Sequence, residues 1–158
     1  MKLYMKQRFF SWRDKFSVYN EAGEEIYYVE GEVFTLGKRL HLYDRGGREL
    51  AFISQRLLTF LPKFEIDRTG KGTVEMVKHF TLFRHEYSIE ALGWSVSGDF
   101  FEHEYEICTP NQLVARVFRE WFTLGDAYAI EVAQDEDEVM ALAVALVVDA
   151  VLESHSRE

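Results

Sequence analysis

The segment that most constrains the fold of this chain is an apolar run near its end, from Val139 to Leu152. These fourteen residues contain one charged residue, Asp149. Four consecutive acids, Asp135 to Glu138, come directly before the run, and acidic side chains stabilise the N-terminus of a helix. We therefore predict a helix over about residues 136–153, with Asp135 as the candidate N-cap.

A helix that is apolar on every face must be enclosed. Fourteen residues span about 21 Å at about 1.5 Å per residue, which is shorter than the roughly 30 Å hydrocarbon core of a bilayer. We therefore expect no transmembrane span, and we place the helix inside the protein.

The rest of the chain repeats a strand-turn-strand pattern with a period of about 20 to 24 residues. The repeats begin FSWRDKFSV, FTLGKRLHL, LTFLPKFEI, FTLFRHEYSI, FFEHEYEI and FTLGDAYAI. Each contains two apolar residues spaced two apart, which is the alternation of a half-buried strand. These pairs are Phe16/Val18, Leu40/Leu42, Phe64/Ile66, Tyr87/Ile89, Tyr105/Ile107 and Tyr128/Ile130.

Most pairs are followed by a turn signal, such as NEAGEE or DRGGRE, and then by a second β-rich run such as IYYV or LAFI. With the opening KLYMKQRF, the pattern gives about twelve short strands in mostly sequential antiparallel order. A propeller is the alternative for such a period, but this is too few strands for blades of four. Gly37 and Gly125 of the repeated FTLG are interpreted as turn residues that join strands, without a ligand.

A closed sheet of this size is wide enough to hold a helix. The predicted fold is therefore mainly β, a closed antiparallel barrel over residues 1–133 around a central hydrophobic C-terminal helix. All 158 residues are expected to form a single domain.

Composition excludes several classes of function. The net charge of -9 argues against nucleic-acid binding, which depends on cationic contacts to phosphates. The single cysteine, Cys108, excludes an internal disulfide, and we expect a cytoplasmic protein without a signal peptide. Cys108 has no evident base nearby, and no Gly-rich phosphate loop, HExxH or Ser-His-Asp order is found, so we expect no enzyme activity and no cofactor.

The hairpins of FSVYNEAGEEIYYVEGEVFTLGKRLHLYDRGGRELAFISQRLLTFLPKFEID, the strand WFTLGDAYAIEV and the closing apolar helix together resemble the LURP-one-related family. That resemblance implies a tubby C-terminal-like fold, a twelve-stranded barrel around a hydrophobic helix, and a relation to phospholipid scramblases. Tubby domains bind phosphoinositide headgroups through basic residues, and scramblases are linked to calcium and lipid movement. Asp126 and Asp149 lie where the scramblase pattern also has acids, although the acid spacing here departs from the scramblase calcium pattern.

The basic residues of the first strand are the candidate ligand surface. In an extended MKLYMKQRF, Lys2, Tyr4, Lys6 and Arg8 share one face, which could meet phosphate headgroups. An ordinary solvated strand face is the alternative, since lysine also discourages strand aggregation.

Acids and histidines are weaker candidates for metal binding. The tripeptide HEY occurs twice, so His85 and His103 could converge on a divalent metal, and Asp135 and Asp137 could bind calcium. Descent from one repeat explains the histidines without a metal, and the helix dipole explains the acids. Asp149 would be a buried carboxylate that needs a backbone N–H or an arginine as its partner, with a ligand or proton role as the alternative.

These observations predict a non-enzymatic domain that binds a phospholipid headgroup, such as a phosphoinositide or another anionic lipid, or a protein at the membrane surface. The alternative is a scramblase-like membrane protein whose terminal helix leaves the barrel to insert. A metal-dependent enzyme is the third hypothesis.

Overall fold

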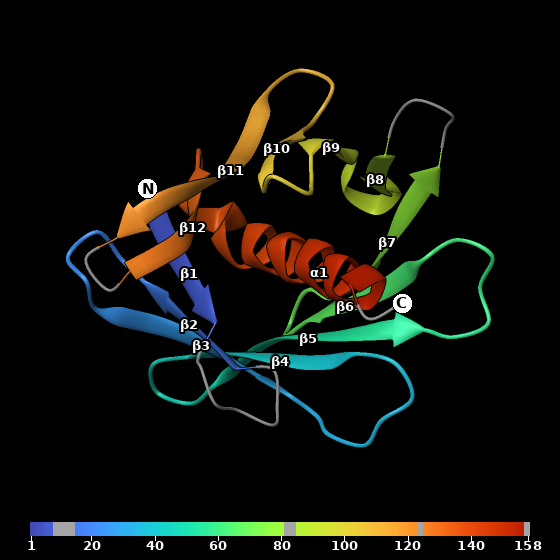
Figure 1. Ribbon diagram of the computed structural model, residues 1–158, viewed down its shortest axis with the longest axis horizontal. Helices are drawn as coiled ribbons and strands as arrows, with labels where there is room; N and C mark the ends of the chain where they lie inside the picture. Colours follow the sequence, from blue (N-terminus) through green and yellow to red (C-terminus); the bar gives the residue numbers. More distant parts are fainter. Residues whose placement is uncertain (8–14, 81–84, 123–124, 157–158) are drawn as a thin grey trace.

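The computed structural model describes residues 1–7, 15–80, 85–122 and 125–156. The chain forms a closed barrel of twelve antiparallel strands with the helix α1 along its interior, which confirms the predicted fold class (Figure 1). The strands follow sequence order around the barrel, and β1 closes it by pairing with both β2 and β12. Their bounds are β1 (Lys2–Gln7), β2 (Lys15–Tyr19), β3 (Glu25–Gly31), β4 (Arg39–Asp44), β5 (Glu49–Arg56), β6 (Lys63–Arg68), β7 (Gly72–Phe80), β8 (His85–Ile89), β9 (Trp94–Asp99), β10 (Glu104–Cys108), β11 (Leu113–Phe122) and β12 (Gly125–Val132).

The strands form where the sequence alternates, and the alternation decides which side chains face the helix. The predicted apolar pairs of β2, β4, β6, β8 and β10 are all buried in one core cluster with α1. In β12, Ile130 is fully buried, whereas Tyr128 is half-buried at the edge of that cluster. The core therefore lies between the inner wall and the helix.

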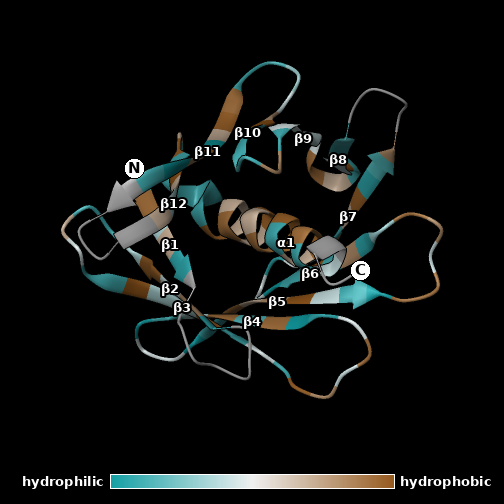
Figure 2. Ribbon diagram, viewed as in Figure 1, coloured by the Kyte–Doolittle hydropathy of each residue, from teal (hydrophilic) through white to brown (hydrophobic). Residues whose placement is uncertain are grey.

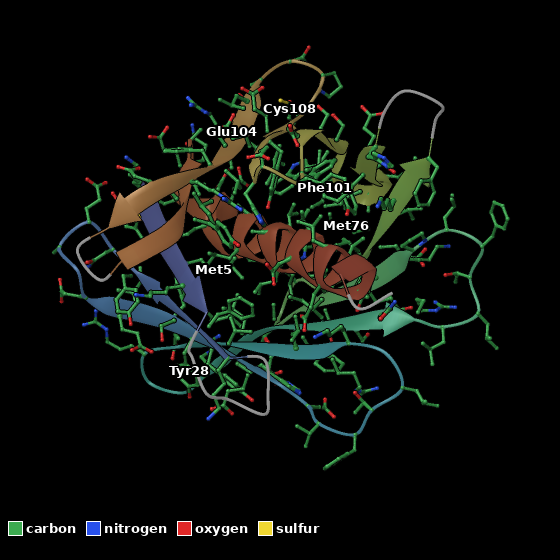
Figure 3. All side chains as sticks on the ribbon, in the orientation of Figure 1. Met5, Tyr28, Met76, Phe101, Glu104 and Cys108 are labelled. Carbon is green, nitrogen blue, oxygen red and sulfur yellow. The ribbon has the colours of Figure 1, made fainter. Side chains whose placement is uncertain are left out.

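The helix α1 (Glu138–Ser156) fills the barrel. Every residue from Met140 to Val148 is buried, and Met5 and Met76 lie between the wall and the helix (Figure 3). The predicted helix is confirmed, but the predicted cap is wrong. Asp135 begins a short 3-10 turn, Asp135–Asp137, that Gln134 precedes without a side-chain capping bond; the backbone N–H of Asp137 instead donates to the Gln134 carbonyl at 3.0 Å.

The helix is held to the wall at both ends. The Tyr27 hydroxyl of β3 donates to Glu138 Oε1 at 2.5 Å, and Lys38 Nζ contacts Glu153 Oε2 at 2.9 Å. Burial, followed by this bond to Glu138, raises the pKa of Tyr27. Among the described helices, none combines the length and apolarity that crossing a bilayer would need.

The connections between strands alternate between two ends of the barrel, because the strands are antiparallel and sequential. We call one end the polar end; it carries Met1 and the turns 20–24, 45–48, 69–71, 90–93, 109–112 and 133–137. The opposite end carries the loops 32–38, 57–62 and 100–103 and the C-terminal part of α1, and we call it the apolar end. In Figure 2 the loops after β3 and β5 are largely brown, whereas the turn between β4 and β5 is teal and white.

Candidate functional site

Large apolar side chains that face solvent gather at the apolar end of the barrel. Phe34, Leu58 and Phe60 are fully exposed there. The described part of the chain has seven exposed large hydrophobic residues at this end: Phe34, Leu36, Leu57, Leu58, Phe60, Phe80 and Phe101. At the polar end the described counterparts are Met1 and Leu113. Exposed apolar surface of this kind is typical of sites that contact a protein or a membrane.

Two of these loops have the same local structure, and we call residues 32–38 and 57–62 the tip loops. Phe34 and Leu58 each have a φ of 59°, a left-handed conformation that is uncommon for a bulky residue. The hydroxyl of the next residue then donates to the carbonyl two positions on, at 2.8 Å for Thr35 to Gly37 and at 2.7 Å for Thr59 to Leu61. Each tip loop thus turns its apolar side chains outward while its hydroxyl is bound internally.

The tip loops lie side by side because they flank the paired strands β4 and β5. The Lys38 N–H donates to Gln55 Oε1 at 3.1 Å, and the Gln55 N–H donates to the Lys38 carbonyl at 2.9 Å. Gly37 has a φ of +83°, and a Cβ there would lie 3.0 Å from Leu57 Cδ2. Gly37 is a turn residue as predicted, but the FTLG around it also forms an exposed apolar surface.

Basic residues lie directly behind the uncharged tips. Lys38 and Arg39 follow the run VFTLG, and the run LLTFLP lies between Arg56 and Lys63. Their charges are met by carboxylates: Arg39 lies 3.2 Å from Glu32, and Arg56 lies 2.6 Å from Glu65. In the described tip loops, exposed apolar side chains therefore predominate over free positive charge.

A cavity of about 550 Å³ opens at the same end, between the strands β7 to β9 and the last turns of α1. Lys78, His85, Tyr87, Ser97, Gly98, Asp99, Phe100, Phe101 and Leu152 line it. Lys78 is only 6% exposed, and burial lowers the pKa of its ammonium group. The ring of Phe80 lies 4.9 Å from Lys78 Nζ.

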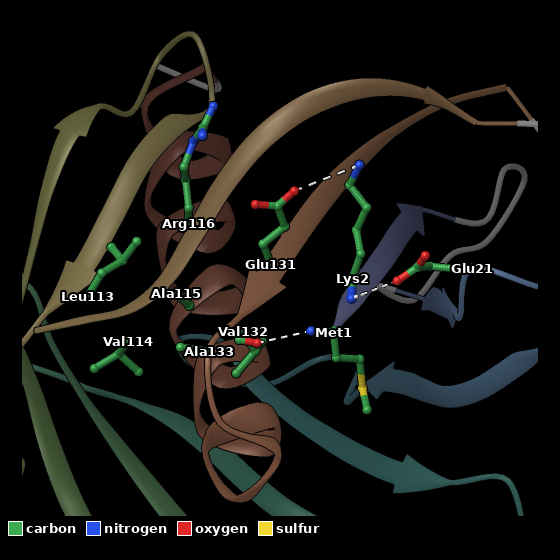
Figure 4. Close-up of a pocket in the computed structure, with 10 residues that line it drawn as sticks. All are labelled: Met1, Lys2, Glu21, Leu113, Val114, Ala115, Arg116, Glu131, Val132 and Ala133. Carbon is green, nitrogen blue, oxygen red and sulfur yellow. Dashed lines mark hydrogen bonds and ion pairs between the residues drawn. The ribbon is translucent and has the colours of Figure 1, made fainter.

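The first cation of the predicted basic face on β1 is paired with carboxylates of neighbouring strands. The alternation is as predicted, with Leu3 and Met5 buried inside and Lys2 outside. However, Lys2 Nζ lies 2.7 Å from Glu120, and this bond raises the pKa of Lys2. Lys2 Nζ also lies 3.8 Å from Glu131 (Figure 4).

Tyr4 is buried in a small outer cluster with Ala127 and Ala129. Lys6 is half-buried, and the predicted Arg8 lies outside the described residues. Because β1 pairs on both sides, it is no edge strand. Headgroup binding through the face of Lys2, Tyr4, Lys6 and Arg8 stays a prediction.

The predicted metal candidates are not brought together. His85 begins β8 and packs edge-on against Phe80, whereas the ring of His103 stacks on Tyr128 with centroids 4.2 Å apart. Asp135 and Asp137 lie at the polar end, across the barrel from His85. Among the described residues, no group of three or more His, Cys, Asp or Glu side chains could hold a metal ion.

Asp149 is half-buried, not enclosed as expected. It lies in the C-terminal part of α1, toward the end where the barrel opens into the cavity. The buried Tyr105 has a pKa well above its usual value, raised first by burial and then by the charge of Asp149. Burial also raises the pKa of the Cys108 thiol, which disfavours its nucleophilic thiolate form.

The sequence did not lead us to predict the tip loops or Lys78 as site residues, although it contains a signal for each. The apolar residues of FTLG and LTFL precede the alternating pairs, so they fall on connections where packing does not require them. Lys78 lies two residues after Met76 and four after Val74, so the alternation of β7 directs it inward.

Comparison with known proteins agrees with this fold. Residues 1–149 match the family model described as LURP-one-related. The uncharacterized protein YxjI of Bacillus subtilis (strain 168) is 34% identical over 152 residues, which cover 96% of this chain and 94% of YxjI. An X-ray structure of an Arabidopsis thaliana protein superposes with a TM-score of 0.67 at 15% identity, covering 95% of this chain and 90% of that one. The fold, the family match and the identity to YxjI lead to one conclusion: this chain belongs to the LURP-one-related family.

Proposed function

We propose that this protein is a non-enzymatic domain that docks on a phospholipid bilayer through the apolar end of its barrel. The observation that carries the proposal is the exposure of Phe34, Leu58 and Phe60 on neighbouring tip loops. Moving each of these side chains from water into an apolar environment would contribute about 1.5–3 kcal/mol of free energy. A surface that inserts them would recover part of that free energy.

The shape of the apolar end favours a bilayer over a protein partner. Its apolar side chains project from separate loops, and a fluid bilayer accommodates separate projections without a matching surface. The hydroxyls of Thr35 and Thr59 are bound within their own loops, which lowers the cost of moving them into a less polar medium. Phenylalanine and leucine on an interfacial surface, with basic residues behind them, suit the boundary between headgroups and acyl chains.

Charge would make a small contribution to this docking. Lys38 is engaged with Glu153, Arg39 with Glu32, and Arg56 with Glu65. The protein also has a net charge of -9, which opposes attraction to anionic lipids. We therefore propose docking driven by apolar burial, with weak dependence on salt and on headgroup charge.

Insertion of the terminal helix, the scramblase-like alternative, would carry a large cost. Met140 to Val148 are buried against the barrel wall, so withdrawal of α1 would expose the inner wall as well as the helix. Docking through the tip loops leaves that core intact.

Co-sedimentation with phosphatidylcholine vesicles tests the proposal. The wild-type protein should bind, and the double variant Phe34→Ser/Phe60→Ser should bind at least about tenfold more weakly. Both residues are fully exposed, so the variant should fold and melt like the parent.

Leu113→Ser provides the matched control, because Leu113 at the polar end is 46% exposed and Leu57 at the apolar end is 48% exposed. Leu113→Ser should leave vesicle binding unchanged, and Leu57→Ser should weaken it. Failure of the wild-type protein to bind vesicles with or without phosphoinositides would overturn the proposal and leave a protein partner for this surface.

A further inference from the structure

A lysine occupies a position where the barrel otherwise has apolar side chains. In β7 the inward row runs Val74, Met76, Lys78, and the first two members are buried in the core. In the neighbouring strand the residue paired with Lys78 is Tyr87, which is also buried. The ammonium group of Lys78 therefore lies at the mouth of the barrel interior and not on its outer wall.

Within the described part of the chain, Lys78 Nζ has no ion pair or hydrogen bond, and its contact is the face of Phe80 at 4.9 Å. The side chain is 6% exposed. A buried ammonium group without an acceptor is costly, because it has lost its water. Burial lowers its pKa accordingly.

The wall beside Lys78 combines a close strand contact with an aromatic lining. Gly98 lies opposite Tyr105 at a φ of +145°, and a Cβ there would lie 2.5 Å from the Glu104 carbonyl oxygen, so the close approach of β10 requires glycine at this position. Phe100 packs edge-on against Tyr87 with ring centroids 5.0 Å apart and forms an aromatic lining. The resulting cavity of about 550 Å³ is within the roughly 300–1,000 Å³ typical of small-molecule sites.

Among the described residues that line the cavity, Lys78 is the buried cation. His85 is exposed at the rim, and burial raises the pKa of Tyr87, so its hydroxyl stays neutral and can donate. Asp99 is the acid of the lining, and its Oδ1 accepts the N–H of Glu102 at 3.1 Å. That bond engages the Asp99 carboxylate with its own loop.

We propose that this cavity binds an anionic amphiphile, a single negatively charged head on an apolar chain. The head, a carboxylate or a phosphate, contacts Lys78 Nζ and the Tyr87 hydroxyl. The chain lies on Phe100, Phe101 and Leu152, toward the exposed apolar end of the barrel. The inference rests on the proposed membrane docking for the source of the ligand, since the cavity opens at the surface that would meet the lipid.

Titration calorimetry with soluble short-chain probes tests the site without a membrane. The wild-type protein should bind decanoate or decyl phosphate, and it should bind decanol and inorganic phosphate at least about tenfold more weakly, because each lacks one half of the ligand. A preference for decanoate indicates a fatty acid, and a preference for decyl phosphate indicates a phosphate-headed lipid. Equal binding of decanol and both anionic probes would overturn the role of the charge.

Variants separate this site from the docking surface. Lys78→Met should lose about tenfold or more in affinity for the anionic probe while still binding phosphatidylcholine vesicles, and Lys78→Arg should retain most of the affinity. Phe34→Ser/Phe60→Ser should keep the probe and lose the vesicles. Unchanged probe affinity in a folded Lys78→Met protein, or no binding of either anionic probe to the wild type, would refute the site whatever the vesicle result.

Discussion

The two ends of the barrel are built from the same repeat, but the exposed apolar side chains gather on the connections at one of them. At the polar end, side-chain oxygens accept backbone N–H groups: Asn20 Oδ1 accepts from Ala22 and Glu24, and Asp44 Oδ1 accepts from Gly46 and Arg48. At the apolar end the loop after β9 uses the same kind of bond, since Asp99 Oδ1 accepts from Glu102, but in the tip loops the hydroxyls donate to carbonyls and apolar side chains face out. One end therefore presents polar turns to water, and the other presents exposed apolar side chains, which is the basis of the proposed docking.

The same contrast appears in the backbone. Turns of the polar end place glycines at positive φ, among them Gly23, Gly47 and Gly70. The tip loop 32–38 also has Gly37 at positive φ, but the tip loops place Phe34 and Leu58 there as well, although a left-handed conformation costs a bulky residue roughly 1–2 kcal/mol. Strain of this kind is retained at functional positions. The tip loops therefore carry two strained positions that the glycines of the polar-end turns avoid.

The largest effect should come from the core that both ends share. Val144→Asp places an unpaired charge at a fully buried position of α1 and should destabilise the fold by about 3–5 kcal/mol. Thermal unfolding should then occur roughly 10 °C or more below that of the parent. Val144→Ala should cost less, because it removes apolar contact without adding charge. If Val144→Asp melts like the parent, the helix is not the common core.

The next largest effect should be a difference between the two ends in how much the side-chain hydrogen bonds of one turn contribute to the free energy of unfolding. Asp44→Ala removes the acceptor of two turn N–H groups, at 2.9 Å from Gly46 and 3.0 Å from Arg48, and should cost about 1–2 kcal/mol in urea unfolding. Thr35→Val removes one hydroxyl bond and should cost about 0.5–1 kcal/mol. Vesicle binding should be unchanged in Asp44→Ala. Weaker vesicle binding in that variant would mean that the polar end also docks.

A smaller effect should have opposite signs at the two ends. Phe34→Gly removes the left-handed strain of a fully exposed residue, so the fold should gain about 0–1 kcal/mol while vesicle binding weakens. Gly70→Ala at the polar end, where φ is +78° and no atom lies within 4 Å of the added Cβ, should lose about 1 kcal/mol and bind vesicles normally. A clear loss of stability in Phe34→Gly would contradict the strain at the tip.

The barrel could be predicted from the sequence because its signal is periodic. Alternating pairs such as Phe64/Ile66 are decided by burial alone, and the apolar run of α1 could be satisfied only inside a closed sheet. The prediction of Asp135 as the N-cap was wrong because Asp135 lies within a 3-10 turn that precedes α1. The residue type of Asp135 does not indicate such a turn.

The candidate site was harder to predict because it depends on exposure and pairing. Lys2 belongs to a basic stretch in the sequence, yet its ammonium lies against Glu120, which is far away along the chain and becomes a neighbour only when β1 closes the barrel. Phe34 and Phe60 look like core residues by type, and only the fold places them outside. A lysine in the inward row of β7 was the one local clue to the cavity.

The smallest effect concerns His41, which lies in the middle of β4 and connects the two ends. Its Nε2 lies 2.8 Å from Glu32 of a tip loop, and its Nδ1 contacts Glu49, which begins β5 at the polar end. Burial lowers the pKa of His41, but the bonds to Glu49 and Glu32 together raise it above its usual value.

A raised pKa in the folded state means that protonated His41 stabilises the fold below its unfolded pKa of about 6.5, and that this contribution disappears as the pH rises through the folded pKa. Urea unfolding at about pH 6 and about pH 9 should show a loss of stability in the wild type that is smaller in His41→Gln. Other groups titrate in both proteins, so the difference between the two pH profiles isolates His41. Identical profiles would show that the two ends are not connected through its charge.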